Sequence, residues 1–237
     1  KVGMIFQDPL TSLNPTMKIG LQVCEPLRVH EGLSKREALE RAVEILKRVG
    51  MPRPEVVINN YPHQLSGGMR QRVMIAMALV CKPRILIADE PTTALDVTTQ
   101  MQILDLIDEL RDEYQMGVIL ITHDLGVVAH NCDYVAIIYA GTLMEYGALR
   151  EIFKSPQHPY TIGLFGSIPS LERKADRLRP IPGLMPDPTN LPPGCPFSER
   201  CPHSAEVCSR EVPALVQLGG EHVVRCVLAR GRVSHDR

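Results

Sequence analysis

Two apolar runs separated by a helical segment constrain the fold of this chain more than any other feature. The first run, Ile85–Pro91, has the sequence ILIADEP, and the second, Gly117–Asp124, has the sequence GVILITHD. Between them, residues 99–114 place apolar side chains at helical spacing. A strand, a helix and a second strand of these lengths are typical of a parallel crossover. We therefore predict an α/β fold built on a parallel sheet.

Both runs end in side chains that can do chemistry. Asp89 and Glu90 close the first run, and His123 lies near the end of the second. Because parallel strands present their carboxyl ends at one edge of a sheet, we expect these side chains to converge. Successive side chains point to opposite sides, so Asp89 can reach Mg²⁺ while Glu90 takes a proton from water. Taken without other motifs, a pair of solvated acids and a structural histidine is the favoured interpretation.

A pair of glycines at the start of a helix is a further feature. The stretch LSGGMRQR covers residues 65–72, and Ser66 is a strong N-cap candidate for a mostly apolar helix that continues to Leu79. Glycine inside a helix costs about 1 kcal/mol relative to alanine, so Gly67 and Gly68 need a reason other than folding. The free N–H groups of such a helix end bind phosphate readily. A glycine turn before a core helix is the alternative.

Two shorter patterns predict local structure elsewhere. Residues 2–6, VGMIF, suit a buried strand that ends at Gln7. Ser34 and Glu37 have the spacing of a capping box, and apolar residues follow at helical spacing until Gly50. We therefore expect one amphipathic helix between the first strand and the glycine pair.

Composition limits the classes of protein to which the chain can belong. Its 237 residues are 44% hydrophobic, which is enough for one sizeable α/β core with an appendage. The 26 lysines and arginines nearly balance 27 aspartates and glutamates, so no overall charge argues for nucleic acid as a partner. The longest uncharged apolar run, Val73–Cys81, is about half of the roughly 18 residues that a membrane span needs. We expect no membrane crossing and no signal peptide.

The ordered set of motifs resembles the nucleotide-binding domain of ATP-binding cassette (ABC) transporters. The set comprises FQ, LSGGMRQR, ILIADEP, TALD and ITHD, and it is far more specific than any single member. The resemblance implies an α/β fold of the ABC-type P-loop NTPase class, with a parallel RecA-like sheet, a helical signature subdomain and a loop-rich C-terminal extension. It divides the chain into a partial ATPase core with the Q-loop (1–18), the helical subdomain (19–80), the remaining core (81–150) and the extension (151–237).

The same resemblance implies a role for each matching residue. It makes Glu90 the catalytic base, His123 the switch histidine and Gln7 the Q-loop glutamine, and it assigns Mg²⁺ to Asp89 and Gln7. It also implies that the signature and the D-loop contact an ATP molecule that is bound mainly by another subunit. These residues are Ser66, Gly67, Gly68, Met69 and Asp96. Met69 stands where the family more commonly has glutamine.

Longer stretches narrow the resemblance to the dipeptide and oligopeptide importers of bacteria. MRQRVMIAMAL, DEPTTALDVT, HDLGVVA and the tail HPYTIGL…IPG…GCPF…RCP carry this likeness, which extends to about Ala229. It implies a peripheral ATPase subunit at the cytoplasmic face of the inner membrane that powers peptide import. The implied partners are a paralogous ATPase, two transmembrane permease subunits and, indirectly, an extracytoplasmic peptide-binding protein, with no nucleic acid.

Other functions remain open at this point. An ABC subunit that imports another small solute such as nickel is one alternative, and a non-transport ABC ATPase is another. A non-catalytic regulatory module is a third, although intact Glu90 and His123 argue against it.

One motif of the family is missing from the sequence. No stretch matches the phosphate-cradling loop G-x-x-x-x-G-K-[ST], whose backbone and lysine hold the nucleotide phosphates. In the family this loop precedes the Q-loop, so we expect the chain to begin inside the domain. We also expect these 237 residues alone to bind ATP very weakly and not to hydrolyse it.

Cysteines gather near the end of the chain. Cys24, Cys81 and Cys132 lie singly among apolar neighbours and are typical of small buried hydrophobes. The other four, in a proline-rich region that needs a staple, are Cys195, Cys201, Cys208 and Cys226. Four thiolates suffice for tetrahedral Zn²⁺ or an iron–sulfur cluster, with disulfides or free thiols as alternatives. The family resemblance implies a 4Fe-4S cluster, with structural Zn²⁺ as the second choice.

Overall fold

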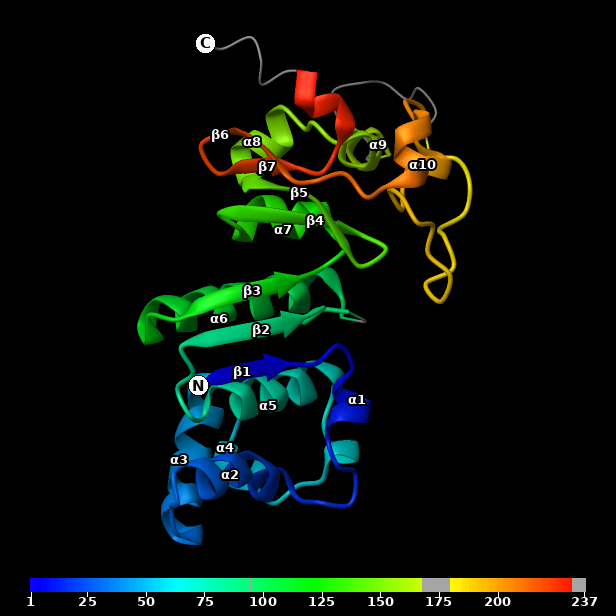
Figure 1. Cartoon of the computed structure of the whole chain (residues 1–237). Coiled ribbons are helices and arrows are strands. Elements are labelled where there is room, and N and C mark those ends of the chain that lie inside the picture. The colour runs from blue at the N-terminus through cyan, green and yellow to red at the C-terminus, as the bar shows by residue number, and fades with distance from the viewer. Residues whose placement is uncertain (94, 168–179, 232–237) are drawn as a thin grey trace. The chain divides into compact units, whose positions relative to one another are not determined.

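The computed structural model describes residues 1–93, 95–167 and 180–231, which form two compact units (Figure 1). The first unit is Lys1–Asn131 and the second is Cys132–Arg237. Each unit contains its own β-sheet and its own buried apolar cluster. Among the described residues, no helix combines the length and the apolar character that a membrane crossing requires.

A parallel sheet lies at the centre of the first unit. Its three strands are β1 (Val2–Ile5), β2 (Ile85–Asp89) and β3 (Gly117–Ile121), in the spatial order β1-β2-β3. The helix α6 (Val97–Tyr114) connects β2 to β3, which confirms the predicted strand, helix and strand unit. The last residues of β2 and β3 pair with each other, so these two strands end level at the carboxyl edge of the sheet.

The segment between β1 and β2 is helical. It contains α1 (Pro9–Ser12), α2 (Ile19–His30), α3 (Lys35–Arg48), α4 (Pro54–Val57), the short 3-10 helix η1 (Pro62–Gln64) and α5 (Gly67–Leu79). The predicted capping box is present, because Ser34 Oγ accepts from the Glu37 N–H at 3.3 Å and Glu37 Oε2 accepts from the Ser34 N–H at 3.0 Å. Gly50, with a φ of 71°, follows α3 in the left-handed region, as expected of a helix stop.

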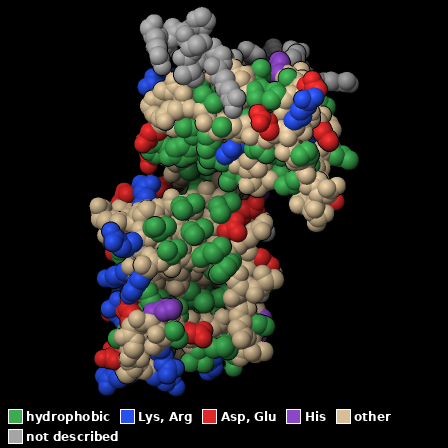
Figure 2. Space-filling model, viewed as in Figure 1, with side chains coloured by type: hydrophobic (Ala, Val, Ile, Leu, Met, Phe, Trp, Pro, Cys, Tyr) green, Lys and Arg blue, Asp and Glu red, His purple; other side chains and the backbone are tan. Residues whose placement is uncertain are grey.

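The two faces of the parallel sheet have different surroundings. On one face, Ile5, Leu86 and Ala88 are buried in a core shared with α5 and α6. The other face carries exposed apolar side chains, visible as the hydrophobic surface over β1, β2 and β3 in Figure 2: Val2, Met4, Ile85, Ile119 and Ile121. The prediction of a buried strand at residues 2–6 is therefore wrong for the exposed half of its side chains. The reason is that α5 and α6 cover a single face, whereas parallel sheets usually have both faces covered.

The second unit is built on an antiparallel sheet. Its strands are β4 (Tyr134–Tyr139), β5 (Thr142–Ala148), β6 (Val216–Gly219) and β7 (His222–Val224), in the order β4-β5-β7-β6. Its helices are α8 (Leu149–Lys154), α9 (Pro159–Gly166), α10 (Glu206–Arg210) and the short 3-10 helices η2 (Ser198–Arg200) and η3 (Val227–Gly231). Residues 180–197 contain no helix or strand, as their proline content predicted, whereas β6 and β7 add regular structure that it did not predict. The helix α7 (Leu125–Asn131) ends the first unit.

A buried carboxylate joins three elements of the second unit. Glu145 on β5 is fully buried, and its oxygens accept from the backbone N–H groups of Gln157 at 2.7 Å and His158 at 2.9 Å. The His222 Nε2 atom on β7 lies 2.8 Å from Glu145 Oε1. A buried charge is tolerated when it is paired and hydrogen-bonded in this way. Glu145 therefore fixes β7 and the start of α9 against β5.

Candidate active site

Three predicted site residues meet just beyond the carboxyl edge of the parallel sheet. Gln7 follows β1, Glu90 follows β2 and His123 follows β3. The Gln7 Nε2 group donates to Glu90 Oε2 at 2.8 Å, and His123 Nδ1 lies 3.1 Å from Glu90 Oε1. The expected convergence of Glu90 and His123 is therefore present, and Gln7 joins them from the third strand.

The backbone of Glu90 adopts a conformation that side-chain-bearing residues rarely take. Its φ is 44°, in the left-handed region, and the residue after it is Pro91. Such a conformation costs on the order of 1–3 kcal/mol and persists only where surrounding contacts enforce it. The Glu90 N–H donates to the Ile121 carbonyl at 2.9 Å, and the Thr93 N–H donates to the Glu90 carbonyl at 3.1 Å. These bonds anchor the turn to β3 and close it on itself.

The carboxylate of Glu90 is held by donors on both oxygens. Thr93 Oγ1 donates to Glu90 Oε2 at 2.8 Å, on the same oxygen that accepts from Gln7. Hydrogen bonds from Thr93, then His123 and Gln7, lower the pKa of Glu90 below its usual range. Glu90 is therefore ionised at neutral pH and can accept a proton once a donor is withdrawn. Sequence reasoning placed Thr93 only in the D-loop stretch, and its spacing of three residues from Glu90 within a turn is the signal that could have indicated this contact.

Asp89 and Gln7 have the donor types that the predicted magnesium site needs. Asp89 is half-buried at the end of β2, and Gln7 brings an amide oxygen to the same edge. Mg²⁺ binds oxygen ligands and takes many of them from water and nucleotide phosphates, so one or two protein ligands suffice. The residues at this edge therefore fit a magnesium ion that arrives with a nucleotide.

The helix α5 begins at the glycine pair, as predicted. Ser66 caps it by accepting from the Met69 N–H at 3.3 Å, which confirms the N-cap. A Cβ atom added at Gly67 would meet no atom within 4 Å, so folding within the described residues does not require glycine there. An added Cβ at Gly68 would lie 3.2 Å from Thr99 Cγ2, a close approach between the first turns of α5 and α6. The open space at Gly67 is what close contact with a ligand at this helix end would need.

Two further predicted ligand residues have structural contacts of their own. The Met69 side chain is partly buried and packs against the core of the first unit. Asp96 caps α6, since its carboxylate oxygens accept from the Thr99 N–H at 3.0 Å and the Thr99 Oγ1–H at 2.7 Å. These hydrogen bonds, the backbone one first, lower the pKa of Asp96. Ala94, within the TALD motif, lies outside the described residues.

Comparison with family models agrees with this geometry. A model described as "ABC transporter" matches residues 1–93, and one described as "Oligopeptide/dipeptide transporter, C-terminal region" matches residues 144–208. A putative peptide import ATP-binding protein of Brucella melitensis is 53% identical over 232 residues, which cover 95% of this chain and 69% of that protein. The chain belongs to the ATP-binding subunits of ABC peptide importers.

Two other members of this family support the assignment. An oligopeptide transport ATP-binding protein of Salmonella typhimurium is 54% identical over 90% of this chain and 64% of its own length. A dipeptide transport ATP-binding protein of Bacillus subtilis is 52% identical over 99% of this chain and 70% of its own length. This chain thus spans roughly two thirds of the length of these ABC subunits.

Solved structures confirm the ABC ATPase fold. The ABC transporter component cbiO1 from Clostridium perfringens is similar at a TM-score of 0.56 and 33% identity, over 65% of this chain and 59% of its own. A dimeric ATP-binding cassette bound to ADP and phosphate in a post-hydrolysis state is similar at a TM-score of 0.55 and 35% identity, over 63% of each chain. The predicted α/β class of the ABC-type NTPase core is therefore correct, and membership of this family implies ATP and Mg²⁺ as ligands.

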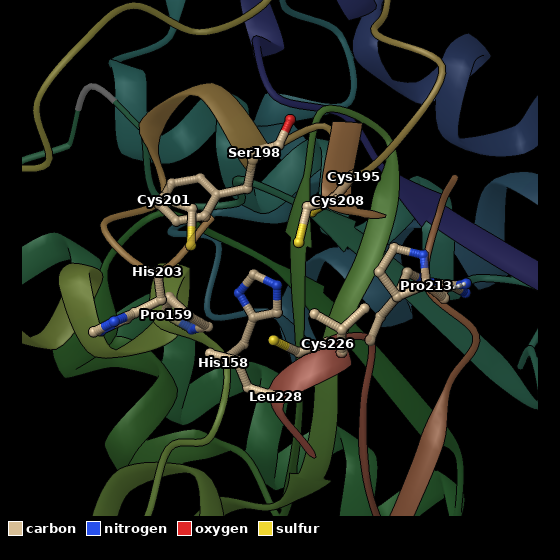
Figure 3. A pocket seen from close by; sticks show the side chains of 13 residues that line it. His158, Pro159, Cys195, Ser198, Cys201, His203, Cys208, Pro213, Cys226 and Leu228 are labelled. Atoms are coloured by element: carbon tan, nitrogen blue, oxygen red, sulfur yellow. Dashed lines mark hydrogen bonds between the residues drawn. The ribbon is translucent and has the colours of Figure 1, made fainter. Parts of the chain in front are cut away.

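The four late cysteines of this ABC subunit surround one small cavity. Cys195, Cys201, Cys208 and Cys226 line it together with His158, as Figure 3 shows. The cavity has a volume of about 20 Å³, which is room for one or two water molecules. All seven cysteines lie among the described residues, and none of them forms a disulfide there.

The prediction of a 4Fe-4S cluster or structural Zn²⁺ at these cysteines is wrong. In the described part of the chain, which includes all four, no group of three or more Cys, His, Asp or Glu side chains is placed to hold a metal ion. Burial also raises the pKa of the thiols of Cys195, Cys201 and Cys226, which favours the neutral thiol over the thiolate that ligates metal. The clustering of four cysteines near the end of the chain suggested a ligand set, but the folded region packs these thiols as small hydrophobes.

Proposed function

We propose that this chain is the signature-bearing part of an ATPase subunit that powers import of dipeptides or oligopeptides across a bacterial inner membrane. The observation that carries the proposal is the meeting of Gln7, Glu90 and His123 beyond the carboxyl ends of three parallel strands. The peptide-import names of the relatives and the match to the oligopeptide/dipeptide C-terminal region support peptides as the cargo. That match favours peptides over nickel or another small solute.

In this proposal Glu90 is the general base of ATP hydrolysis. Its ionised carboxylate accepts a proton from the water that attacks the γ-phosphate. Both of its oxygens are engaged in the described structure, so Gln7 and His123 have to turn toward other partners before Glu90 acts. His123, whose side chain is 79% exposed, is free to rotate toward a phosphate oxygen.

Oxygen atoms of Asp89 and Gln7 would hold Mg²⁺, which neutralises charge on the β- and γ-phosphates. The N–H groups at the start of α5, beside Ser66, Gly67 and Gly68, would receive phosphate oxygens of a nucleotide held mainly by another subunit. Asp96 would lie in the same subunit contact. The phosphate-cradling loop has no counterpart in these 237 residues, so Gln7, Asp89, Glu90 and His123 form only part of a complete nucleotide site.

The assembly that we propose follows from the contact of two subunits with one nucleotide. A second, paralogous ATPase subunit would pair with this one, and closure of the pair on ATP would drive two transmembrane permease subunits. A peptide-binding protein outside the membrane would supply the cargo, and the subunit would lie peripherally at the cytoplasmic face. Nucleic acid has no place in this cycle.

The test uses the complete subunit, including the phosphate-cradling loop, assembled with its partners. We expect Glu90→Gln to reduce single-turnover hydrolysis at its own site by about 100-fold or more while ATP-dependent closure survives. Glu109→Gln, at an exposed position of α6, is the charge-matched control and should keep wild-type turnover. Wild-type turnover in Glu90→Gln would show that the base is another residue.

A further inference from the structure

We propose that Gln71 is a positioning residue that holds the Glu90–Pro91 turn against α5. The inference rests on the proposed function for its effect on catalysis, because Glu90 is the proposed base. Its structural part stands on contacts within the first unit alone. Sequence reasoning assigned no role to Gln71 beyond its place in the helix that follows the glycine pair.

Gln71 makes a buried hydrogen bond to the backbone of this turn. Only 2% of the residue is exposed, and its Nε2 group donates to the Pro91 carbonyl at 2.6 Å. The bond joins residues 20 positions apart, one in the second turn of α5 and one directly after the proposed base. Gln71 lies between Arg70 and Arg72, but its own side chain is buried, and a buried polar group without a hydrogen-bond partner would be costly. The bond to the Pro91 carbonyl satisfies it.

The Pro91 carbonyl is an effective point at which to hold this turn. Proline has no N–H group, so the carbonyl is the sole main-chain hydrogen-bonding group of Pro91, and Pro91 is buried. Glu90 combines a φ of 44° with a position before proline, where steric contacts already restrict the backbone. The bonds from Glu90 to Ile121 and from Thr93 to Glu90 fix one side of the turn. The Gln71 bond fixes the other side.

This arrangement connects the start of α5 to the proposed base. Ser66 caps α5 five positions before Gln71, and Gly68 lies close to Thr99 at the start of α6. A displacement of α5 on binding an anion at its first turn would act on the Pro91 carbonyl through a short, buried side chain. We infer that Gln71 links occupancy at the signature helix to the orientation of the Glu90 carboxylate.

The experiment compares Gln71→Met with Gln22→Met in the complete subunit and its assembled transporter. Each substitution replaces a buried glutamine with methionine, which is of similar size but cannot donate a hydrogen bond. Gln22 is a matched position because it is 3% exposed and donates to the carbonyls of Asn14 and Met17. Hydrogen exchange of the Glu90 and Thr93 amides is measured without nucleotide. We expect exchange in this turn to accelerate at least 10-fold in Gln71→Met and to stay at the wild-type rate in Gln22→Met.

Turnover provides the second readout. In Gln71→Met, kcat per active site should fall about 10-fold or more with the KM for ATP unchanged, because the base is misplaced while binding is kept. Gln22→Met should lower thermal stability with little change in kcat. If Gln71→Met does not fold, Gln71→Asn, which keeps an amide but shortens its reach, carries the same test with a smaller loss.

Two outcomes would overturn the inference. One is an unchanged exchange rate in the 90–93 turn of folded Gln71→Met, and the other is an equal loss of kcat in Gln22→Met. A wild-type transporter that does not hydrolyse ATP would instead refute the proposed function, and the exchange measurement would still decide whether Gln71 holds the turn.

Discussion

Gln7 and Glu90 are separated by 83 residues in sequence, yet the Gln7 side-chain amide donates to the Glu90 carboxylate at 2.8 Å. The contact joins the loop after β1 to the turn after β2, and it occupies the oxygen that Thr93 also uses. A carboxylate engaged in this way is a weaker base than a free one, because its charge is already stabilised. In the proposed mechanism, the described geometry is therefore a resting arrangement, and Gln7 has to release Glu90 before Glu90 acts as a base.

The first prediction concerns Thr93, the leading cause of the lowered Glu90 pKa. Thr93→Val removes one donor to Oε2, so the pKa of Glu90 should rise toward the ordinary value of a glutamate. A depressed carboxyl pKa stabilises the folded state above the unfolded pKa, and this contribution is lost as pH falls through the folded value. Thr93→Val should therefore destabilise the folded chain at pH 7 by no more than a few tenths of a kcal/mol, because solvent screens this exposed contact, and by less at low pH.

Carbon-detected NMR titration of the Glu90 carboxyl measures this change directly. Thr92→Val, at the neighbouring half-buried threonine, is the matched control and should leave the titration of Glu90 where it is in the wild type. An unshifted Glu90 in Thr93→Val would mean that His123 and Gln7 alone set its pKa.

The second prediction separates the two roles of Ser66. Ser66 and Ser34 are both N-cap residues whose side chains accept from the backbone N–H three residues on, at 3.3 Å in each case. Ser66→Ala and Ser34→Ala should each destabilise the chain by about 1 kcal/mol in urea unfolding. In the assembled transporter, Ser66→Ala should also reduce ATP turnover, whereas Ser34→Ala should not. Equal turnover in both variants would leave Ser66 as a helix cap alone.

The third prediction concerns His158 in the second unit. Burial lowers its pKa from 6.5 to about 4, so the unfolded chain binds a proton there before the folded chain does. The free energy of unfolding should consequently decrease as pH falls from 6.5 toward 4, by up to about 3 kcal/mol from this group. His158 Nδ1 accepts from the Tyr160 N–H at 3.0 Å, which an asparagine oxygen can also do.

His158→Asn should therefore keep the cap and lose most of that pH dependence. His203 is an exposed histidine that lines the cavity of the four late cysteines, and His203→Asn is the control. This variant should keep the wild-type pH dependence of unfolding. Chemical unfolding followed at pH 7, 5.5 and 4.5 makes the comparison. A wild-type pH dependence in His158→Asn would show that His158 is not the group responsible.

Much of the first unit could be predicted because its signals are local. Helical spacing and the capping box at Ser34 predicted α3, and Ser66 predicted the start of α5. The apolar runs before Glu90 and His123 predicted adjacent parallel strands, and from these followed the shared edge of the sheet. The prediction that residues 2–6 form a buried strand was wrong for alternate side chains, which are exposed. A short apolar run does not show whether one or both faces of a strand are covered.

The cysteines show where spacing alone misleads. Four of them in the last fifth of the chain resembled a ligand set, and nothing in their spacing distinguishes thiolates from buried thiols. That difference depends on the dielectric environment around each sulfur, which the packing of Tyr139, Met144 and Phe197 sets. The contact between buried Glu145 and His222, which is 77 positions away, could not be predicted from the sequence either.

The sequence by itself determined the order of the motifs, the helix caps and the family, because each of these depends on residues that are close together in the sequence. Tertiary structure alone decided that Gln7, Thr93 and His123 share the Glu90 carboxylate, that Gln71 reaches the Pro91 carbonyl, and that burial raises the pKa of three late thiols. The physical reason is that hydrogen bonds and desolvation act over a few ångströms in space, and pairs separated by tens of residues acquire those distances only when the chain has folded.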